Sequence, residues 1–261
     1  MSKSYFILFF ALLSITMPAQ EPLYLKNTID LNADHFWGTD AFDALFFSKE
    51  NVFTKEWNNQ KWEFTDYSLG ELTFVSLLNP LKILLFYGNS NTVVILDKYL
   101  NEIKRIDFNV INGFINIHSV SPANDNTIWV FNSNSQRLEL LNTITLKTIL
   151  STQPIDQLPI YQFSNFNFCW LVTDKVIYKF NIYGSLVEEI KNEGFSKLQS
   201  FNEQLYLFKN HNVYTIEKSK TKIDKILLPE IKAEQFYVTD EILYIYDLRK
   251  LYSFDITSLK K

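Results

Sequence analysis

The sequence predicts an all-β protein built from six repeats, and three observations support this prediction. Short runs of alternating apolar and polar residues recur along the chain, as in strands with one buried face. Val, Ile, Leu, Tyr and Phe fill these runs, and such residues favour strands. Corresponding runs end near Trp57, Asp97, Asn142, Asn181, Lys218 and Asp255, at spacings of 40, 45, 39, 37 and 37 residues. A nearly constant spacing of this kind is typical of a repeat architecture.

The first segment of the chain predicts export. Lys3 precedes a mostly apolar stretch from Tyr5 to Ile15, and Thr16-Met17-Pro18-Ala19 comes before Gln20. This is the pattern of a signal peptide over residues 1–19, which leaves a single domain over residues 20–261. An uncleaved amino-terminal anchor and a buried structural segment are the alternatives. The apolar stretch is short for a membrane span, so no span is expected after cleavage.

The first three repeats are predicted from alternating runs separated by turn-forming residues. The first contains His35–Trp37, Phe42–Phe47, Asn51–Trp57 and Lys61–Tyr67. The second contains Thr73–Asn79, Leu81–Tyr87, Asn91–Asp97 and Asn101–Phe108. The third contains Phe114–Ser121, Thr127–Asn132, Arg137–Asn142 and Leu146–Leu150. Longer turns in the third repeat explain its wider spacing.

The last three repeats follow the same pattern, but the sixth ends one strand short. The fourth contains Ile160–Ser164, Phe168–Thr173, Val176–Asn181 and Leu186–Lys191. The fifth contains Phe195–Phe201, Gln204–Lys209, Val213–Lys218 and Lys222–Leu228. The sixth contains Ala233–Thr239, Ile242–Asp247 and Leu251–Ile256. The segment Leu23–Leu31 resembles the outer strand Glu102–Phe108, so we expect it to complete the sixth repeat.

This arrangement resembles the six-bladed β-propeller superfamily, over the chain from about Leu23 to about Ile256. The resemblance implies six four-stranded blades, the last completed by an amino-terminal strand that closes the ring. It is one of fold only, because no Trp-Asp blade end or double-glycine signature marks a subfamily. Six glycines are few for so many turns, and roughly two dozen asparagines, which tolerate positive φ, replace them. A tandem of β-sandwiches, a barrel and a solenoid are the alternative folds.

The composition limits the cell compartment in which the protein is expected and the classes of partner that it is expected to bind. The single cysteine, Cys169, excludes an intramolecular disulfide, and no cysteine stands at the signal cleavage site for lipid attachment. We therefore expect a periplasmic or outer-envelope protein that is not a lipoprotein. The net charge is −4 with no long block of one sign, which argues against nucleic acid as a partner.

Five oxygen-bearing side chains lie near the ends of the predicted innermost strands. They are Asp40, Asn79, Asn165, Asn202 and Asp240. Ca²⁺ takes six to eight oxygen ligands. In some six-bladed lactonase-like hydrolases a central calcium is held by such side chains, so the resemblance implies calcium as one interpretation. Asp and Asn are also the residues that tight turns prefer, and the turn interpretation is favoured. No other cofactor is expected.

Two tryptophans, Trp57 and Trp62, flank a polar turn and are candidate binding residues. Exposed, they would stack on a sugar or anchor a protein. Opposite one another across a hairpin, they would form a stabilising cross-strand pair, and this interpretation is favoured.

No nucleophile, metal or nucleotide motif stands out in the sequence. The leading functional hypothesis is therefore a non-enzymatic binding or scaffold protein that acts through its propeller faces on an envelope protein. The alternatives are a calcium-dependent, lactonase-like hydrolase with a site at the propeller axis, and a carbohydrate or small-ligand sensing module.

Overall fold

The computed structural model of the protein describes residues 22–111, 115–202, 204–216 and 223–260. The predicted signal peptide lies outside these residues, as do Phe114, Lys218 and Lys222 from the predicted strands. Within these ranges the helical segments are two short 3₁₀ turns, η1 (Tyr67–Leu69) and η2 (Thr257–Lys260). No helix in the described ranges has the length and apolar character needed to cross a membrane.

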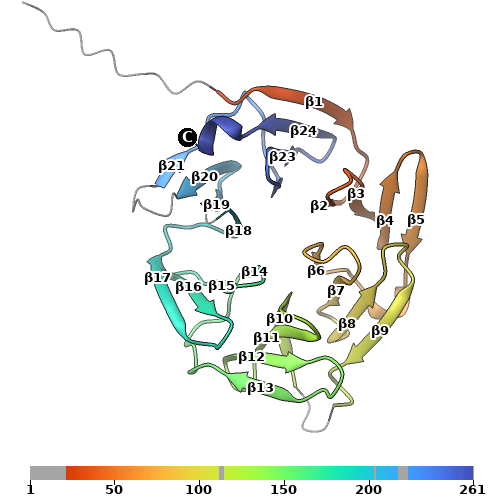
Figure 1. The fold of residues 1–261 in the computed structure, drawn as a ribbon, viewed down its shortest axis with the longest axis vertical. Coiled ribbons are helices and arrows are strands. Elements are labelled where there is room, and N and C mark those ends of the chain that lie inside the picture. Colours follow the sequence, from red (N-terminus) through yellow and green to blue (C-terminus); the bar gives the residue numbers. More distant parts are fainter. Residues whose placement is uncertain (1–21, 112–114, 203, 217–222, 261) are drawn as a thin grey trace, which may run out of the picture.

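The strands form six four-stranded antiparallel sheets arranged around a centre (Figure 1). Blade 1 contains β2 (His35–Thr39), β3 (Leu45–Lys49), β4 (Val52–Trp57) and β5 (Gln60–Phe64). Blade 2 contains β6 (Phe74–Ser76), β7 (Ile83–Tyr87), β8 (Thr92–Leu96) and β9 (Glu102–Asp107). Blade 3 contains β10 (Ile117–Pro122), β11 (Thr127–Asn132), β12 (Arg137–Asn142) and β13 (Thr148–Ser151).

The second half of the ring repeats this order from the centre to the rim. Blade 4 contains β14 (Tyr161–Ser164), β15 (Phe168–Val172), β16 (Val176–Asn181) and β17 (Leu186–Lys191). Blade 5 contains β18 (Lys197–Phe201), β19 (Gln204–Lys209), β20 (Asn212–Ile216) and β21 (Ile223–Lys225). Blade 6 contains β22 (Gln235–Val238), β23 (Ile242–Tyr246), β24 (Lys250–Asp255) and β1 (Leu25–Asp30).

The outermost strand of blade 6 comes from the opposite end of the chain. Strand β1 pairs antiparallel with β24, with Thr28 opposite Tyr252 and Asp30 opposite Lys250. In Figure 1 the two strands lie side by side at the rim. This pairing joins the first and last described segments of the chain in a single sheet.

The predicted fold is confirmed: the chain is all-β and forms a six-bladed propeller of four-stranded blades. The sandwich, barrel and solenoid alternatives are therefore wrong. Several predicted strands, such as Thr127–Asn132 and Leu186–Lys191, have the observed bounds. Others are shorter than predicted, because turns begin earlier than the apolar pattern suggests. The predicted strand Thr73–Asn79, for example, reduces to Phe74–Ser76.

The core lies between the blades, in six clusters that each join two neighbours. One cluster packs Phe46 and Phe53 of blade 1 against Ile83 and Leu85 of blade 2. Another packs Phe36 of blade 1 against Tyr246 of blade 6. Because every blade is buried on both sides, the middle strands are almost continuously apolar, as in β7 and β8.

Asparagine forms many of the tight turns, as the sequence predicts. Asn58 and Asn59 join β4 to β5 with φ of 48° and 60°. Positive φ at both central residues defines a type I′ turn, whose twist matches that of the paired strands. Glu50 and Asn51 join β3 to β4 in the same way.

Polar side chains on the inner strands also bridge neighbouring blades. Gln235 Oε1 accepts a hydrogen bond from Phe36 N at 2.6 Å, which links blade 6 to blade 1. Gln199 Oε1 accepts one from Val238 N at 2.7 Å, which links blades 5 and 6. Gln162 Nε2 donates one to the carbonyl of Trp129 at 3.2 Å, which links blades 4 and 3.

The Tyr246 hydroxyl forms hydrogen bonds with backbone groups of the segment that leads from β1 to β2. It is buried and lies 2.9 Å from the carbonyl of Leu31 and 2.8 Å from that of Ala33, and it accepts the N–H of Ala33 at 3.1 Å. Tyr246→Phe leaves these groups buried without a partner. We expect the free energy of unfolding to fall by about 2 kcal/mol in urea titrations. The exposed Tyr183→Phe is the control, and equal stability of the two variants would contradict this role.

Candidate functional site

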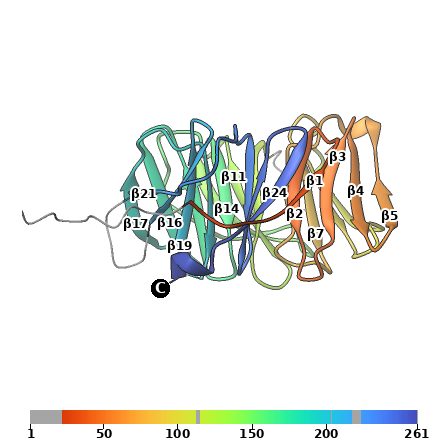
Figure 2. The ribbon, with the colours of Figure 1, turned by 90° about the horizontal axis from the view of Figure 1, so that it is seen from above.

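The sequence-predicted site residues gather toward one face of the ring. Because consecutive strands are antiparallel, the turn after the first strand of each blade and the turn after the third lie on the same side. The segment η2 follows β24, the third strand of blade 6, and lies on the lower side in Figure 2. We call this side the lower face and the opposite side the upper face.

Asp40 follows β2 at the lower face, and its side chain is buried. Its Oδ1 accepts the N–H groups of Phe42 at 2.9 Å and Ala44 at 3.1 Å. Its Oδ2 lies 3.2 Å from Lys55 Nζ, and both side chains are shielded from solvent. Lys55 also lies over the rings of Phe46 and Trp62. The Asp40 carboxylate is thus neutralised by a buried ammonium group.

The other four calcium candidates take part in turns and local contacts. Asn79 Oδ1 accepts Leu81 N at 3.0 Å, and Asn165 Oδ1 accepts the N–H groups of Asn167 and Phe168 at 2.9 Å. Asn202 Nδ2 donates to Asp240 Oδ1 at 2.9 Å and so brings blades 5 and 6 together.

These five residues do not all share one site. Asp40, Asn165 and Asp240 line the cavity at the axis, whereas Asn79 lines a separate groove. In the described ranges no group of three or more His, Cys, Asp or Glu side chains is placed to hold a metal. Calcium binding at the axis stays a prediction.

Trp57 and Trp62 do not face one another. In the β4–β5 pair Trp57 lies opposite Gln60, and Trp62 lies opposite Lys55. The favoured cross-strand stapling interpretation is therefore wrong, because the two-residue turn offsets the rings by two positions. Trp57 is 38% exposed, and its Nε1 donates to the carbonyl of Phe42 at 2.9 Å. Trp62 packs against Tyr99 of blade 2, with ring centroids 6.1 Å apart.

Exposed aromatic side chains concentrate at the lower face. Tyr24, Phe42, Trp57, Tyr99, Phe166 and Tyr183 lie in its turns or at the adjoining strand ends, and all are exposed. Among the described residues, Tyr67 alone is an exposed aromatic of the upper-face turns. Sequence reasoning found only Trp57. The missed signal is an aromatic residue inside an Asx turn, where no core can cover it, as after Asp97, Asn165 and Asn181.

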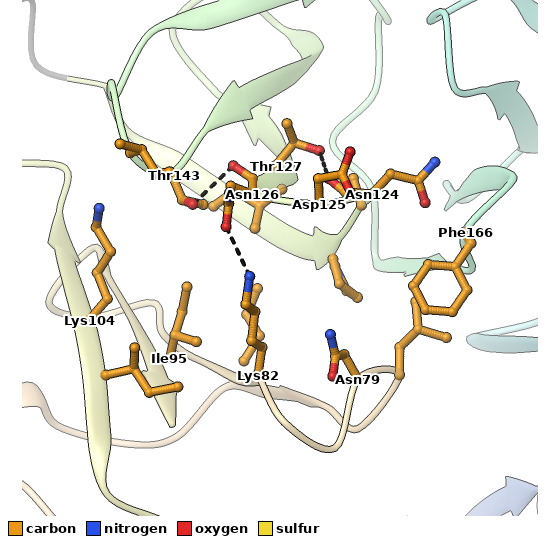
Figure 3. Close-up of a pocket in the computed structure, with 17 residues that line it drawn as sticks. Asn79, Lys82, Ile95, Lys104, Asn124, Asp125, Asn126, Thr127, Thr143 and Phe166 are labelled. Carbon is orange, nitrogen blue, oxygen red and sulfur yellow. Dashed lines mark hydrogen bonds between the residues drawn. The ribbon is translucent and has the colours of Figure 1, made fainter. Parts of the chain in front are cut away.

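A groove of about 700 Å³ opens between blades 2 and 3 (Figure 3). Lys82 extends across it and donates to Asn126 Oδ1 at 2.9 Å, while Phe166 of blade 4 lies at one end. Lys104 lines the opposite end, and Ile103 and Ile144 add exposed apolar surface. The groove therefore joins apolar contact area to two ammonium groups.

A second cavity, of about 830 Å³, follows the propeller axis. The inner strands run toward the lower face, and in blades 1, 4, 5 and 6 the first, third and fifth positions of the inner strand line the cavity. The first residues form an upper layer of His35, Tyr161, Lys197 and Gln235. The third residues form a middle layer of Trp37, Phe163, Gln199 and Tyr237. The fifth positions form a lower layer of Thr39, Asn165, Phe201 and Thr239.

The titratable groups of the upper layer are shifted mainly by burial. Burial lowers the pKa of Lys197, and the charge of Glu234 opposes this shift. Burial also lowers the pKa of His35, and the positive charge of Lys197 lowers it further. Burial raises the pKa of Tyr161 to about 12. The layer therefore contains a neutral imidazole and a protonated phenol at neutral pH.

Cys169 does not contribute to these surfaces. It is buried in β15, and burial raises the pKa of its thiol to about 12. A thiol with so high a pKa is a poor nucleophile.

Comparison with known proteins supports the fold. No family model matches the chain, and no curated protein matches it. A streptogramin B lyase structure matches with a TM-score of 0.62 and 11% identity, over 88% of this chain and 87% of that one. Virginiamycin B lyase from Staphylococcus aureus has the same score and identity, over 88% and 99%.

The structure of a WD40 domain is similar as well. The Pan2 WD40 domain of Neurospora crassa has a TM-score of 0.56 and 11% identity, over 86% of this chain and 75% of that one. Such similarities show the propeller fold, on which unrelated functions occur.

Proposed function

We propose that this chain is an exported, non-enzymatic binding protein of the bacterial envelope that holds a partner protein against its lower face. The observation that carries the proposal is the concentration of exposed aromatic side chains there. Tyr, Trp and Phe are enriched at the centres of protein interfaces, because each buries a large apolar area with few rotatable bonds. The expected signal peptide over residues 1–19 supports export.

The geometry of the lower face suits a protein partner better than a small molecule. The exposed aromatic side chains are spread around the circle of blades, since they come from blades 1, 2 and 4: Phe42, Tyr99, Phe166 and Tyr183. The groove between blades 2 and 3 lies among them. A contact surface that crosses several blades supplies the area that a stable protein complex buries.

Loss of the aromatic rings is expected to abolish partner capture. The test variant combines Phe42→Ser, Phe166→Ser and Tyr183→Ser on the lower face. The control combines Tyr67→Ser, Val110→Ser and Leu158→Ser in upper-face turns, which are similarly exposed. Each tagged protein is expressed at its native level, purified from detergent-solubilised envelopes of its source cells, and analysed by mass spectrometry.

We expect wild type and the control to retain one protein in fixed proportion. The lower-face variant is expected to retain at least about tenfold less of this protein. Thermal unfolding of all three proteins checks that the propeller is still folded. Equal capture by all three, or no protein in fixed proportion with wild type, would contradict the proposal.

A further inference from the structure

A cationic side chain that has no ion-pair partner among the described residues lines the axial cavity. Lys197 is the first residue of β18 and lines the upper layer of the cavity. Within the described part of the chain its ammonium group forms no ion pair and no side-chain hydrogen bond. The carboxylate of Glu234, whose charge acts on Lys197, is held by Lys232 at 2.8 Å and faces His211 at 3.5 Å.

The neighbouring imidazole supplies a second hydrogen-bond donor. Gln235 Oε1 accepts the N–H of Phe36, so its Nε2 is the group that meets His35 Nδ1 at 2.9 Å. Because an amide NH₂ can only donate, His35 Nδ1 accepts, and a neutral ring then carries its proton on Nε2. His35 also stacks on Trp37, with centroids 5.1 Å apart, which fixes the plane of its ring.

The middle layer of the cavity is lined mainly by aromatic side chains, which suit a flat apolar group. Trp37, Phe163 and Tyr237 line the middle of the cavity together with the Gln199 amide. Tyr161 of the upper layer adds a protonated phenol, since burial raises its pKa to about 12. Aromatic walls bind flat rings by stacking and edge contacts, and the volume of about 830 Å³ suits a small molecule.

We propose that the axial cavity binds a small organic carboxylate, with its anionic group paired to Lys197 and His35 and its aromatic body among Trp37, Phe163 and Tyr237. A half-buried ammonium group without a counter-ion is unfavourable, and a bound carboxylate removes that cost. This site is separate from the exposed rings of the lower face, so the proposal stands or falls independently of partner binding.

The test uses the purified full chain and 2-naphthoate as the probe, with binding measured by isothermal titration calorimetry. We expect 2-naphthoate to bind wild type at least about tenfold more tightly than the neutral isostere 2-naphthamide, as expected for a charged hydrogen bond. Lys197→Met is expected to remove this preference, whereas Lys197→Arg is expected to keep it. Lys191→Met on the exposed outer strand β17 is the matched control and should bind like wild type.

A second readout reports on the site itself. Lys197→Met is expected to raise the pKa of His35 in an NMR titration, because the nearby positive charge is lost. Tight 2-naphthoate binding that is unchanged by Lys197→Met, equal affinity for the acid and the amide, or no binding to wild type would overturn the proposal.

Discussion

Lys55→Met is expected to lower the free energy of unfolding by about 3 to 5 kcal/mol, the cost typical of removing one partner from a buried ion pair. Asp40 Oδ2 lies 3.2 Å from Lys55 Nζ, and the side chains are only 2% and 11% exposed. The substitution keeps most of the aliphatic stem against Phe46 and Trp62. It leaves the Asp40 carboxylate buried with two backbone N–H donors and no counter-charge.

The matched control is the double variant Lys55→Met/Asp40→Asn. The amide that replaces the carboxylate has no charge to compensate and its oxygen can still accept the turn N–H groups, so most of the lost stability should return. Urea unfolding of the wild type, the two single variants and the double variant completes the double-mutant cycle. A loss below about 1 kcal/mol for Lys55→Met alone would show that the pair is solvated and that Asp40 does not depend on it.

Gly38→Ala is expected to lower the free energy of unfolding by about 3 kcal/mol, the second largest effect among the substitutions predicted. Gly38 lies at a register shift in β2 with φ of +139°, a conformation that residues with a Cβ rarely adopt. An added Cβ would come 2.5 Å from the ring of Tyr237, which belongs to the neighbouring blade 6. Backbone strain and overlap with this ring therefore add together.

Gly88→Ala provides the comparison for Gly38→Ala. Gly88 does not have a positive φ, and the nearest atom to an added Cβ is Thr73 Oγ1 at 3.1 Å. We expect it to cost less than about 1 kcal/mol in the same urea titrations. Equal costs at the two glycines would contradict the close approach of blades 1 and 6 at Gly38.

The fold could be predicted because the repeat appears directly in the sequence. Alternating runs such as Arg137–Asn142 mark strands, and asparagines such as Asn58 and Asn59 mark the turns between them. The bridges between blades could not be predicted. The side chains of Gln162, Gln199 and Gln235 look like ordinary polar positions of an alternating strand, and their partners are 33 to 199 residues away.

The candidate surface could be predicted only in part. The Asp and Asn residues after the inner strands lie in turns on the lower face, because turns of the same type recur on the same side of each blade, but of the exposed aromatic residues on this face the sequence indicated only Trp57. Sequence alone does not give side-chain direction, so it could not show that Asp40 turns inward to Lys55. It also could not show that Lys197 forms no ion pair with any carboxylate that the structure describes, since this depends on how blades 5 and 6 meet.

Photo-crosslinking from single positions on the two faces tests most directly whether the lower face binds a partner protein. A photoreactive aromatic amino acid replaces Tyr99 or Phe166 on the lower face and Tyr67 or Leu158 on the upper face, and intact cells are irradiated. We predict a crosslink to one envelope protein from both lower-face positions and from neither upper-face position. Crosslinks to that protein only from the upper face, or none from any position, would contradict the proposed function.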